Sequence, residues 1–269
     1  MTTLELLNLD FVRATLVACA LLGVLSGVMA PLVVLRQMSF SVHATSELAL
    51  MGASAALLFG LNVGAGAIAG AVVAALVLAA LGLKGQQDSA VGVVMSFGMG
   101  LSVLFIHLYP GNSGRALSLL TGQIVGVNGQ DLWLLGLTTA VVVVAVAACW
   151  RPLLFASADP EMAAASGVPV RAMAFLFAVL VGVASAQSVQ IVGALLVMSL
   201  LITPGAAAAQ ITASPRRAVI YSVVFAELSA VGGMLLSLAP GVPVSVFVAF
   251  VSFGIYLVCR CVGRYRNAR

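Results

Sequence analysis

Charged residues are scarce in this sequence. Only 7% of its 269 residues are Asp, Glu, Lys or Arg, whereas a soluble globular domain carries about 25%. Apolar residues make up 62% of the chain, and its mean hydropathy is +1.20. No polar stretch is long enough to form a separate soluble domain. The composition therefore excludes a water-soluble protein and predicts one all-α, polytopic membrane domain over residues 1–269.

The low content of net charge, lysine and cysteine excludes several classes of function. The net charge of +4 is spread between apolar segments, which is how membrane proteins set their topology, so we expect no nucleic-acid partner. The only lysine, Lys84, lies outside any G-x-x-x-x-G-K-[ST] motif, so ATP hydrolysis is not expected of this chain. Its four cysteines fall in or at the ends of apolar segments and are expected to pack as small hydrophobic side chains. A transport protein without enzymatic activity fits these absences.

Long apolar segments dominate what is present. A helix of about 20 apolar residues crosses the hydrocarbon core of a bilayer, and nine segments approach that length. They are residues 14–35, 39–61, 63–83, 90–109, 132–149, 172–188, 191–210, 219–238 and 244–262. Two pairs are nearly continuous, so the sequence predicts tight turns at Asn62 and at residues 187–190, or else one broken or re-entrant segment. Eight crossings are the alternative to nine.

The basic residues predict an orientation. Lys and Arg collect in short cytoplasmic loops. With nine crossings and an external N-terminus, Arg36, Lys84, Arg151 and the basic C-terminal tail all lie in the cytoplasm, and Arg13 and Arg115 are the exceptions. We therefore expect a multi-pass protein of the plasma or inner membrane with its C-terminus in the cytoplasm.

His43 and Glu47 stand four residues apart in the second apolar segment. On a helix, residues with this spacing lie on the same face, so both side chains can reach one point. Ionisable groups inside a membrane mark places where a polar species binds or passes, and imidazole and carboxylate suit zinc or manganese. The pair is predicted to bind a divalent metal; the alternative is a packed histidine, with Glu47 paired to Arg36.

Two more ionisable residues lie in apolar segments. Glu227 is eleven residues beyond Arg216, so it lies roughly 16 Å along its helix. It is either a further metal ligand or pathway carboxylate, or a protonated structural residue. His107 is expected at the outer end of the fourth segment, at the membrane interface, with capture of incoming metal as its alternative role.

Three stretches between or within the segments have their own signals. Asp159 is a helix N-cap residue, Pro160 suits the first helical position and Gly167 suits the end, so a short helix is predicted at the cytoplasmic surface. A short external helix is expected at residues 116–124. Thr203, Pro204 and Gly205 interrupt the seventh segment and are predicted to line a pathway or to pack a kink.

Several runs, taken in order, resemble the permease subunits of manganese, zinc and iron ABC importers. Residues 192–208 resemble the segment GALLVVALLITPAATA of that family, and residues 36–40 resemble its RRMSY stretch. Further matches are residues 11–14 with the opening of the first helix, Asp88 with Gly92 at the start of a middle helix, and residues 159–163 with the coupling segment. In the motif GDTLAHASLLG of the family, an Asp and a His bind metal. Those positions correspond here to His43 and Glu47, so the spacing is kept while the ligand types change.

The resemblance implies a permease of the vitamin-B12 and metal-importer fold, paired with a second copy or a paralogous permease. Metal arrives from an extracytoplasmic metal-binding protein, and two cytoplasmic ATP-binding subunits supply the energy. The segment that couples to them is residues 157–167; its implied contact residues are Asp159, Pro160, Glu161, Met162, Ala163 and Gly167. No permanent cofactor is implied, because zinc, manganese or iron is the cargo. The competing interpretations are a secondary transporter driven by an ion gradient, and an ABC permease for a metal chelate.

Overall fold

The computed structural model describes residues 10–82, 87–111, 129–193, 197–238 and 244–267, and these form helices joined by short turns. The short external helix expected at residues 116–124 lies outside the described residues. The helices are α2 (Asp10–Leu35), α3 (Ser39–Leu58), α4 (Val63–Gly82), α5 (Gln87–Leu108), α7 (Gly129–Ala148), α8 (Trp150–Ala158), α9 (Pro160–Ala165), α10 (Val170–Val192), α11 (Val197–Leu201), α12 (Thr203–Ile211), α13 (Pro215–Ser237) and α14 (Val244–Asn267).

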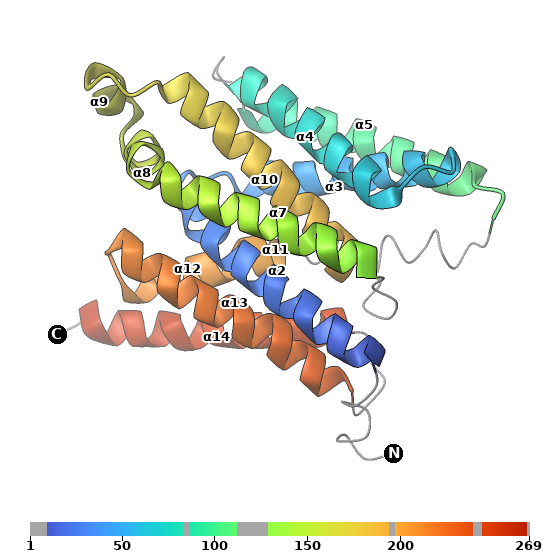
Figure 1. Cartoon of the computed structure of the whole chain (residues 1–269). Coiled ribbons are helices and arrows are strands. Elements are labelled where there is room, and N and C mark those ends of the chain that lie inside the picture. The colour runs from blue at the N-terminus through green and yellow to red at the C-terminus, as the bar shows by residue number, and fades with distance from the viewer. Residues whose placement is uncertain (1–9, 83–86, 112–128, 194–196, 239–243, 268–269) are drawn as a thin grey trace.

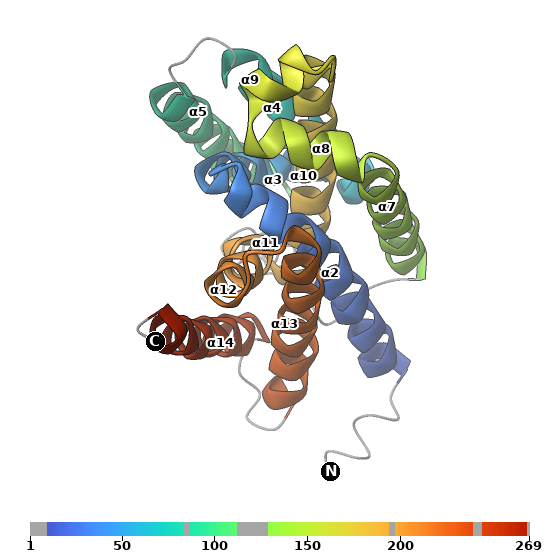
Figure 2. The same cartoon turned by 90° about the vertical axis from the view of Figure 1, so that its left-hand side faces the viewer.

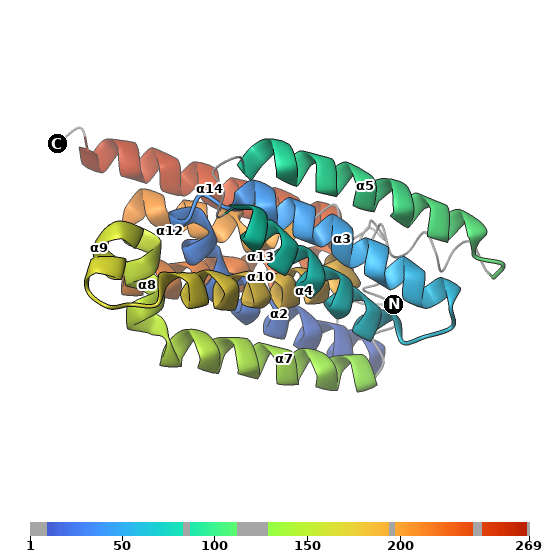
Figure 3. The same ribbon diagram turned by 90° about the horizontal axis from the view of Figure 1, so that it is seen from above.

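The helices pack as two groups that meet along α2, α10 and α11. In one group α3 packs against α4, α5 and α10, and in the other α13 packs against α2 and α14, with α12 beside all three. Figures 1 and 2 show these groups above and below one another, with α11 between α3 and α12. Seen from above, the long helices run nearly side by side (Figure 3). Buried Leu22, Met29, Leu50 and Phe177 belong to one core that joins both groups.

Seven of the described helices are long and apolar enough to cross a membrane. They are α2, α4, α5, α7, α10, α13 and α14, so the expected eight or nine crossings are not reached by this criterion. The two remaining segments are present in other forms. Helix α3 has 20 residues but includes the polar His43 and Glu47, and the seventh expected segment is divided into α11 and α12.

The predicted turn at Asn62 is confirmed. Helix α3 ends at Leu58, Gly60 adopts a φ of 68°, and the Asn62 side chain accepts a hydrogen bond from Ala65 N at 2.9 Å to cap α4. The turn predicted at residues 187–190 is wrong, because α10 continues through them to Val192. The alternative of a broken segment is correct: α10 ends at Val192 with Gly193 as its C-cap, and α11 and α12 follow as short helices.

Helix α3 approaches α4 closely because small residues face each other. A Cβ atom added at Gly52 would lie 2.9 Å from the Gly70 Cα and closer still to the Gly66 carbonyl oxygen. Membrane helices use such positions to bring their backbones together, since apolar burial does not drive helices together in lipid. The contact holds the helix that carries His43 and Glu47 in the interior of its group.

Most of the described basic residues lie at or near helix ends on one side of the molecule. Arg36 follows α2, Arg151 lies in α8, Arg216 begins α13, and Arg260 and Arg264 end α14. In Figure 1 these ends lie on the side of the molecule where α9 lies, and the first turn of α2 lies at the opposite side. The clustering agrees with the charge pattern expected of one membrane face.

Candidate functional site

His43 and Glu47 occupy successive turns of α3. Glu47 is only 2% exposed, and His43 is half-buried with a buried Nδ1 that has no hydrogen-bond partner. Because they are one turn apart on α3, the two side chains are neighbours on the same face of the helix. His43 is therefore the more accessible member of the pair, and Glu47 is covered by the surrounding helices.

Arg36 does not pair with Glu47. Its Nε donates a hydrogen bond to the Ser157 hydroxyl at 2.7 Å, and its guanidinium lies 4.3 Å from the centroid of the Phe177 ring. Sequence analysis assigned Arg36 to the charge pattern, to the stretch that resembles RRMSY, and to a possible partnership with Glu47. Nothing in its neighbourhood along the chain indicated Ser157 or Phe177, because they come from α8 and α10.

Buried polar groups continue on the helices around the pair. On α3 the hydroxyls of Thr45 and Ser46 donate to backbone oxygens of the same helix. On α10, which packs against α3, Ser185 and Gln187 are buried and each has a polar atom without a hydrogen-bond partner. Sequence analysis missed Gln187 because it assigned this residue to a turn; an amide within an apolar segment was the available signal.

Glu227 is apart from this pair within one chain. It lies on α13, where its buried Oε1 has no hydrogen-bond partner, and a Cβ added at Gly23 of α2 would lie 2.8 Å from that oxygen. Among the residues that the structure describes, no three His, Cys, Asp or Glu side chains are grouped so that they could hold a metal ion. One chain thus brings two of the predicted ligands together, His43 and Glu47, and leaves Glu227 at the α2–α13 contact.

The remaining predicted site residues lie in the last turn of α5 and the first turn of α12. His107 is exposed in the last turn of α5. Thr203 begins α12, Pro204 lies in its first turn, and Gly205 meets α2, where an added Cβ would lie 2.7 Å from Pro31 N. These three residues form the start of the helix after the break, and Pro204 and Gly205 are buried.

The predicted short helix after Asp159 is confirmed as α9. The Asp159 side chain caps it by accepting a hydrogen bond from Met162 N at 2.9 Å, Pro160 is in the first turn, and Gly167 has a φ of 83° just past the end. Ala163 is fully buried, while Met162 is 60% exposed and Glu161 is also exposed. The helix is anchored on one side and presents Met162 and Glu161 on the other.

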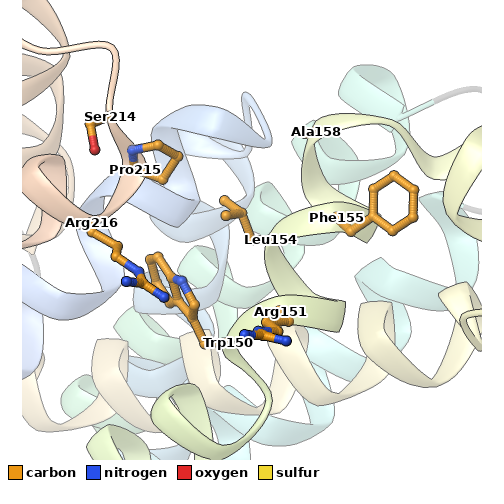
Figure 4. Close-up of a pocket in the computed structure, with 8 residues that line it drawn as sticks. All are labelled: Trp150, Arg151, Leu154, Phe155, Ala158, Ser214, Pro215 and Arg216. Carbon is orange, nitrogen blue, oxygen red and sulfur yellow. The ribbon is translucent and has the colours of Figure 1, made fainter.

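Two adjoining cavities lie beside α8. The first, of about 510 Å³, is lined on one side by Trp150, Leu154 and neighbouring residues of α8 and on the other by the start of α13; Figure 4 shows this arrangement. The second, of about 370 Å³, shares Trp150, Leu154 and Pro215 and extends toward α2 and α12. Neither cavity includes His43 or Glu47.

Comparison with known proteins gives consistent matches along the chain. The model of the ABC 3 transport family matches residues 8–263. The manganese transport system membrane protein MntC of Halalkalibacterium halodurans is 30% identical over 236 residues, covering 87% of this chain and 80% of that protein. The high-affinity zinc uptake system membrane protein ZnuB of Haemophilus influenzae is 28% identical over 219 residues, covering 80% and 84%.

A solved structure has the same fold. PsaBC from Streptococcus pneumoniae, in complex with Fab, superposes with a TM-score of 0.87 at 24% identity, covering 96% of this chain and 94% of that chain. The arrangement of helices in Figures 1–3 is therefore shared with that solved chain.

Proposed function

This chain belongs to the ABC 3 transport family, and on that premise we propose that it is the membrane permease subunit of an ATP-driven importer for divalent transition metal ions. The family resemblance seen in the ordered motifs of the sequence is confirmed. Manganese and zinc are the cargoes that we propose, with iron as a third, because the relatives above are named for manganese and zinc transport. The observation that carries the proposal is this similarity along nearly the whole chain.

We propose that His43 and Glu47 bind the metal in transit. One imidazole and one carboxylate, one helical turn apart, give two ligands. A second copy of the chain, or a paralogous permease, would supply two more across the dimer axis. Because Glu47 is 2% exposed, the packing around α3 must change before the carboxylate can reach the cargo. A site that forms in one conformation and opens in another binds metal well enough to accept it and weakly enough to release it.

The remaining assignments complete the importer. We propose that α9 docks onto cytoplasmic ATP-binding subunits through exposed Met162 and Glu161, which places the basic ends of the helices in the cytoplasm. Helix α3 then counts as a crossing, and α11 with α12 forms one broken crossing, giving nine in all with the N-terminus outside. On this orientation His107 lies at the external interface, near where an extracytoplasmic metal-binding protein delivers the cargo.

Reconstitution tests the proposal directly. Proteoliposomes that contain the permease with its ATPase and metal-binding protein are expected to accumulate Mn²⁺ or Zn²⁺ when ATP is supplied to the ATPase side. Without ATP, or with an ATPase that cannot hydrolyse it, accumulation is expected to stop. Uptake that persists without the ATPase and follows an imposed proton or sodium gradient would identify a secondary transporter. Uptake of a metal chelate in preference to the free ion would identify a chelate permease.

We propose a structural role for Glu227. A buried carboxyl group with one oxygen unpaired and no cation beside it in the described part of the chain is most stable in its protonated form, because burying an uncompensated charge costs much more free energy than binding a proton. Replacing Glu227 by Gln, which keeps the size and removes the acid, is therefore expected to leave metal uptake within roughly twofold of the unsubstituted protein. Uptake in proteoliposomes checks this. A tenfold loss in a fully assembled complex would instead place this carboxylate on the transport route.

A further inference from the structure

We infer that Arg36 is a positioning residue that transmits movement of α8 and α9 to α3, the helix that carries His43 and Glu47. The inference rests on the proposed function, since it assumes that α9 docks onto an ATPase and that α3 binds the cargo. It goes further by naming the contact through which the two are linked. Its basis is the placement of one arginine where three helices that are distant in sequence meet.

The backbone at Arg36 is held in a compact corner. Met38 N donates to the Val33 carbonyl at 3.1 Å and Gln37 N to the Val34 carbonyl at 3.1 Å, the bonds of a Schellman turn. Gln37 occupies the left-handed position of that turn, with a φ of 54°, although glycine is the residue usually found there. Helix α3 begins two residues later, at Ser39. A displacement of the Arg36 side chain is thus passed to the first turn of α3 through a short, hydrogen-bonded connection.

The side chain of Arg36 reaches α8 and α10. Its Nε–H donates to Ser157 Oγ at 2.7 Å, and Ser157 in turn donates to the Leu153 carbonyl of its own helix. Its guanidinium lies over the ring of Phe177, 4.3 Å from the centroid, and Phe177 is fully buried. Burial lowers the pKa of the Arg36 guanidinium to about 10, so the group is still cationic at neutral pH.

Neither contact of Arg36 is an ion pair. In the described part of the chain its recorded partners are a hydroxyl and an aromatic face. Breaking a buried salt bridge is costly because it leaves a buried charge unpaired. A cation held only by neutral groups can move without leaving a buried carboxylate in that state. The contacts of Arg36 with Ser157 and Phe177 can therefore rearrange during the proposed transport cycle at little cost in free energy.

One face of helix α8 is buried, and the other borders a cavity. Leu153 and Ala156 are buried, and Ser157 on the same side meets Arg36. Trp150, Leu154 and Ala158 recur at every fourth residue and line the cavity of about 510 Å³ between α8 and the start of α13, as Figure 4 shows. The space leaves α8 room to move away from α2 and α10 or toward α13. Asp159 then joins α8 directly to α9, so a pull on α9 acts on Ser157 and Arg36.

The test compares metal transported with ATP hydrolysed in proteoliposomes that hold the full importer. Ser157→Ala removes the acceptor of the Arg36 bond with little change in volume, and Arg36→Lys keeps the charge but removes the Nε–H and the planar group. Each is expected to lower the metal transported per ATP by about tenfold, the change that follows from losing one hydrogen bond of a charged group. Because Arg36→Lys already removes the bond to Ser157, the double variant is expected to show the same ratio of metal to ATP as Arg36→Lys alone.

Arg151→Lys is the matched control, since Arg151 lies on α8 and lines the cavity without contacting Arg36. It is expected to leave the ratio of metal to ATP unchanged. The inference is overturned if Ser157→Ala and Arg36→Lys keep the ratio of the unsubstituted importer, or if they lower only the yield of assembled complex. No ATP-driven uptake by the unsubstituted importer would overturn the proposed function, and this inference with it.

Discussion

Replacing Glu47 by Ala is expected to lower ATP-driven uptake of Mn²⁺ or Zn²⁺ by at least about 10- to 100-fold. This is the loss seen when even the second-shell partners of metal ligands are removed, and Glu47 is proposed as a direct ligand. The carboxylate is 2% exposed on a helix surrounded by other helices, so no neighbouring water can fully replace it. Uptake of the radioactive ion into proteoliposomes, at equal amounts of assembled importer, measures the effect.

Ser46→Ala is the matched control for Glu47→Ala. Ser46 is the preceding residue on α3, is fully buried, and its hydroxyl only donates to the His43 carbonyl. Its replacement is expected to leave uptake unchanged. A double replacement, His43→Asp with Glu47→His, places at these two positions the Asp and His of the family motif. This variant is expected to take up metal, unlike Glu47→Ala. Undiminished uptake by the Glu47→Ala importer would show that the cargo binds elsewhere.

Replacing Gly205 by Ala is expected to destabilise the protein by about 1–3 kcal/mol or more, the usual cost of overpacking a close contact. An added Cβ would lie 2.5 Å from the Ala30 carbonyl oxygen and 2.7 Å from Pro31 N. Both are backbone atoms of α2, so no side chain can rotate away and the two helices must separate. Thermal unfolding of the purified protein in detergent measures the loss, and the yield of the importer is expected to fall with it.

Gly232→Ala on α13 is the counterpart. Gly232 lies inside a helix like Gly205, yet nothing lies within 4 Å of the Cβ that would be added there. Alanine favours a helix over glycine by roughly 0.5–1 kcal/mol, so this variant is expected to be at least as stable as the original. Equal stability of the two variants would mean that α12 and α2 are not in close contact. A loss of stability in Gly205→Ala would support the packing role predicted for residues 203–205 over the pathway-lining role.

Because Glu47 is buried, the proposed transport cycle requires α3 to move. A carboxylate that is buried in one conformation can take part in transport only if packing around α3 changes during the cycle. Helix α3 contacts α4 at Gly52, where the backbones nearly touch, and it follows the corner that holds Arg36. The tight contact with α4 makes a movement of the two helices as one unit the simplest change, driven from the corner.

Local signals in the sequence determined most of the secondary structure of this protein. The long apolar segments predicted most of the helices, because a chain in lipid must satisfy its backbone hydrogen bonds within each segment. The residues Asp159, Pro160 and Gly167 predicted α9, and Asn62 predicted the turn before α4, since capping depends on residues only a few positions apart. The spacing of His43 and Glu47 placed both on one face of one helix for the same reason.

Contacts between helices were decided only by the tertiary structure. The segment at residues 187–190 has turn-like composition yet remains helical in α10, because packing outweighs weak local preferences. The sequence paired Glu47 with either a metal or Arg36, whereas Arg36 lies between Ser157 and Phe177, residues 121 and 141 positions away along the chain. The depth at which Glu47 is buried and the separation of Glu227 from it likewise depend on which helices lie side by side. Periodicity identifies the face of a helix that is polar, but the neighbour that covers this face is set by the packing of the whole bundle.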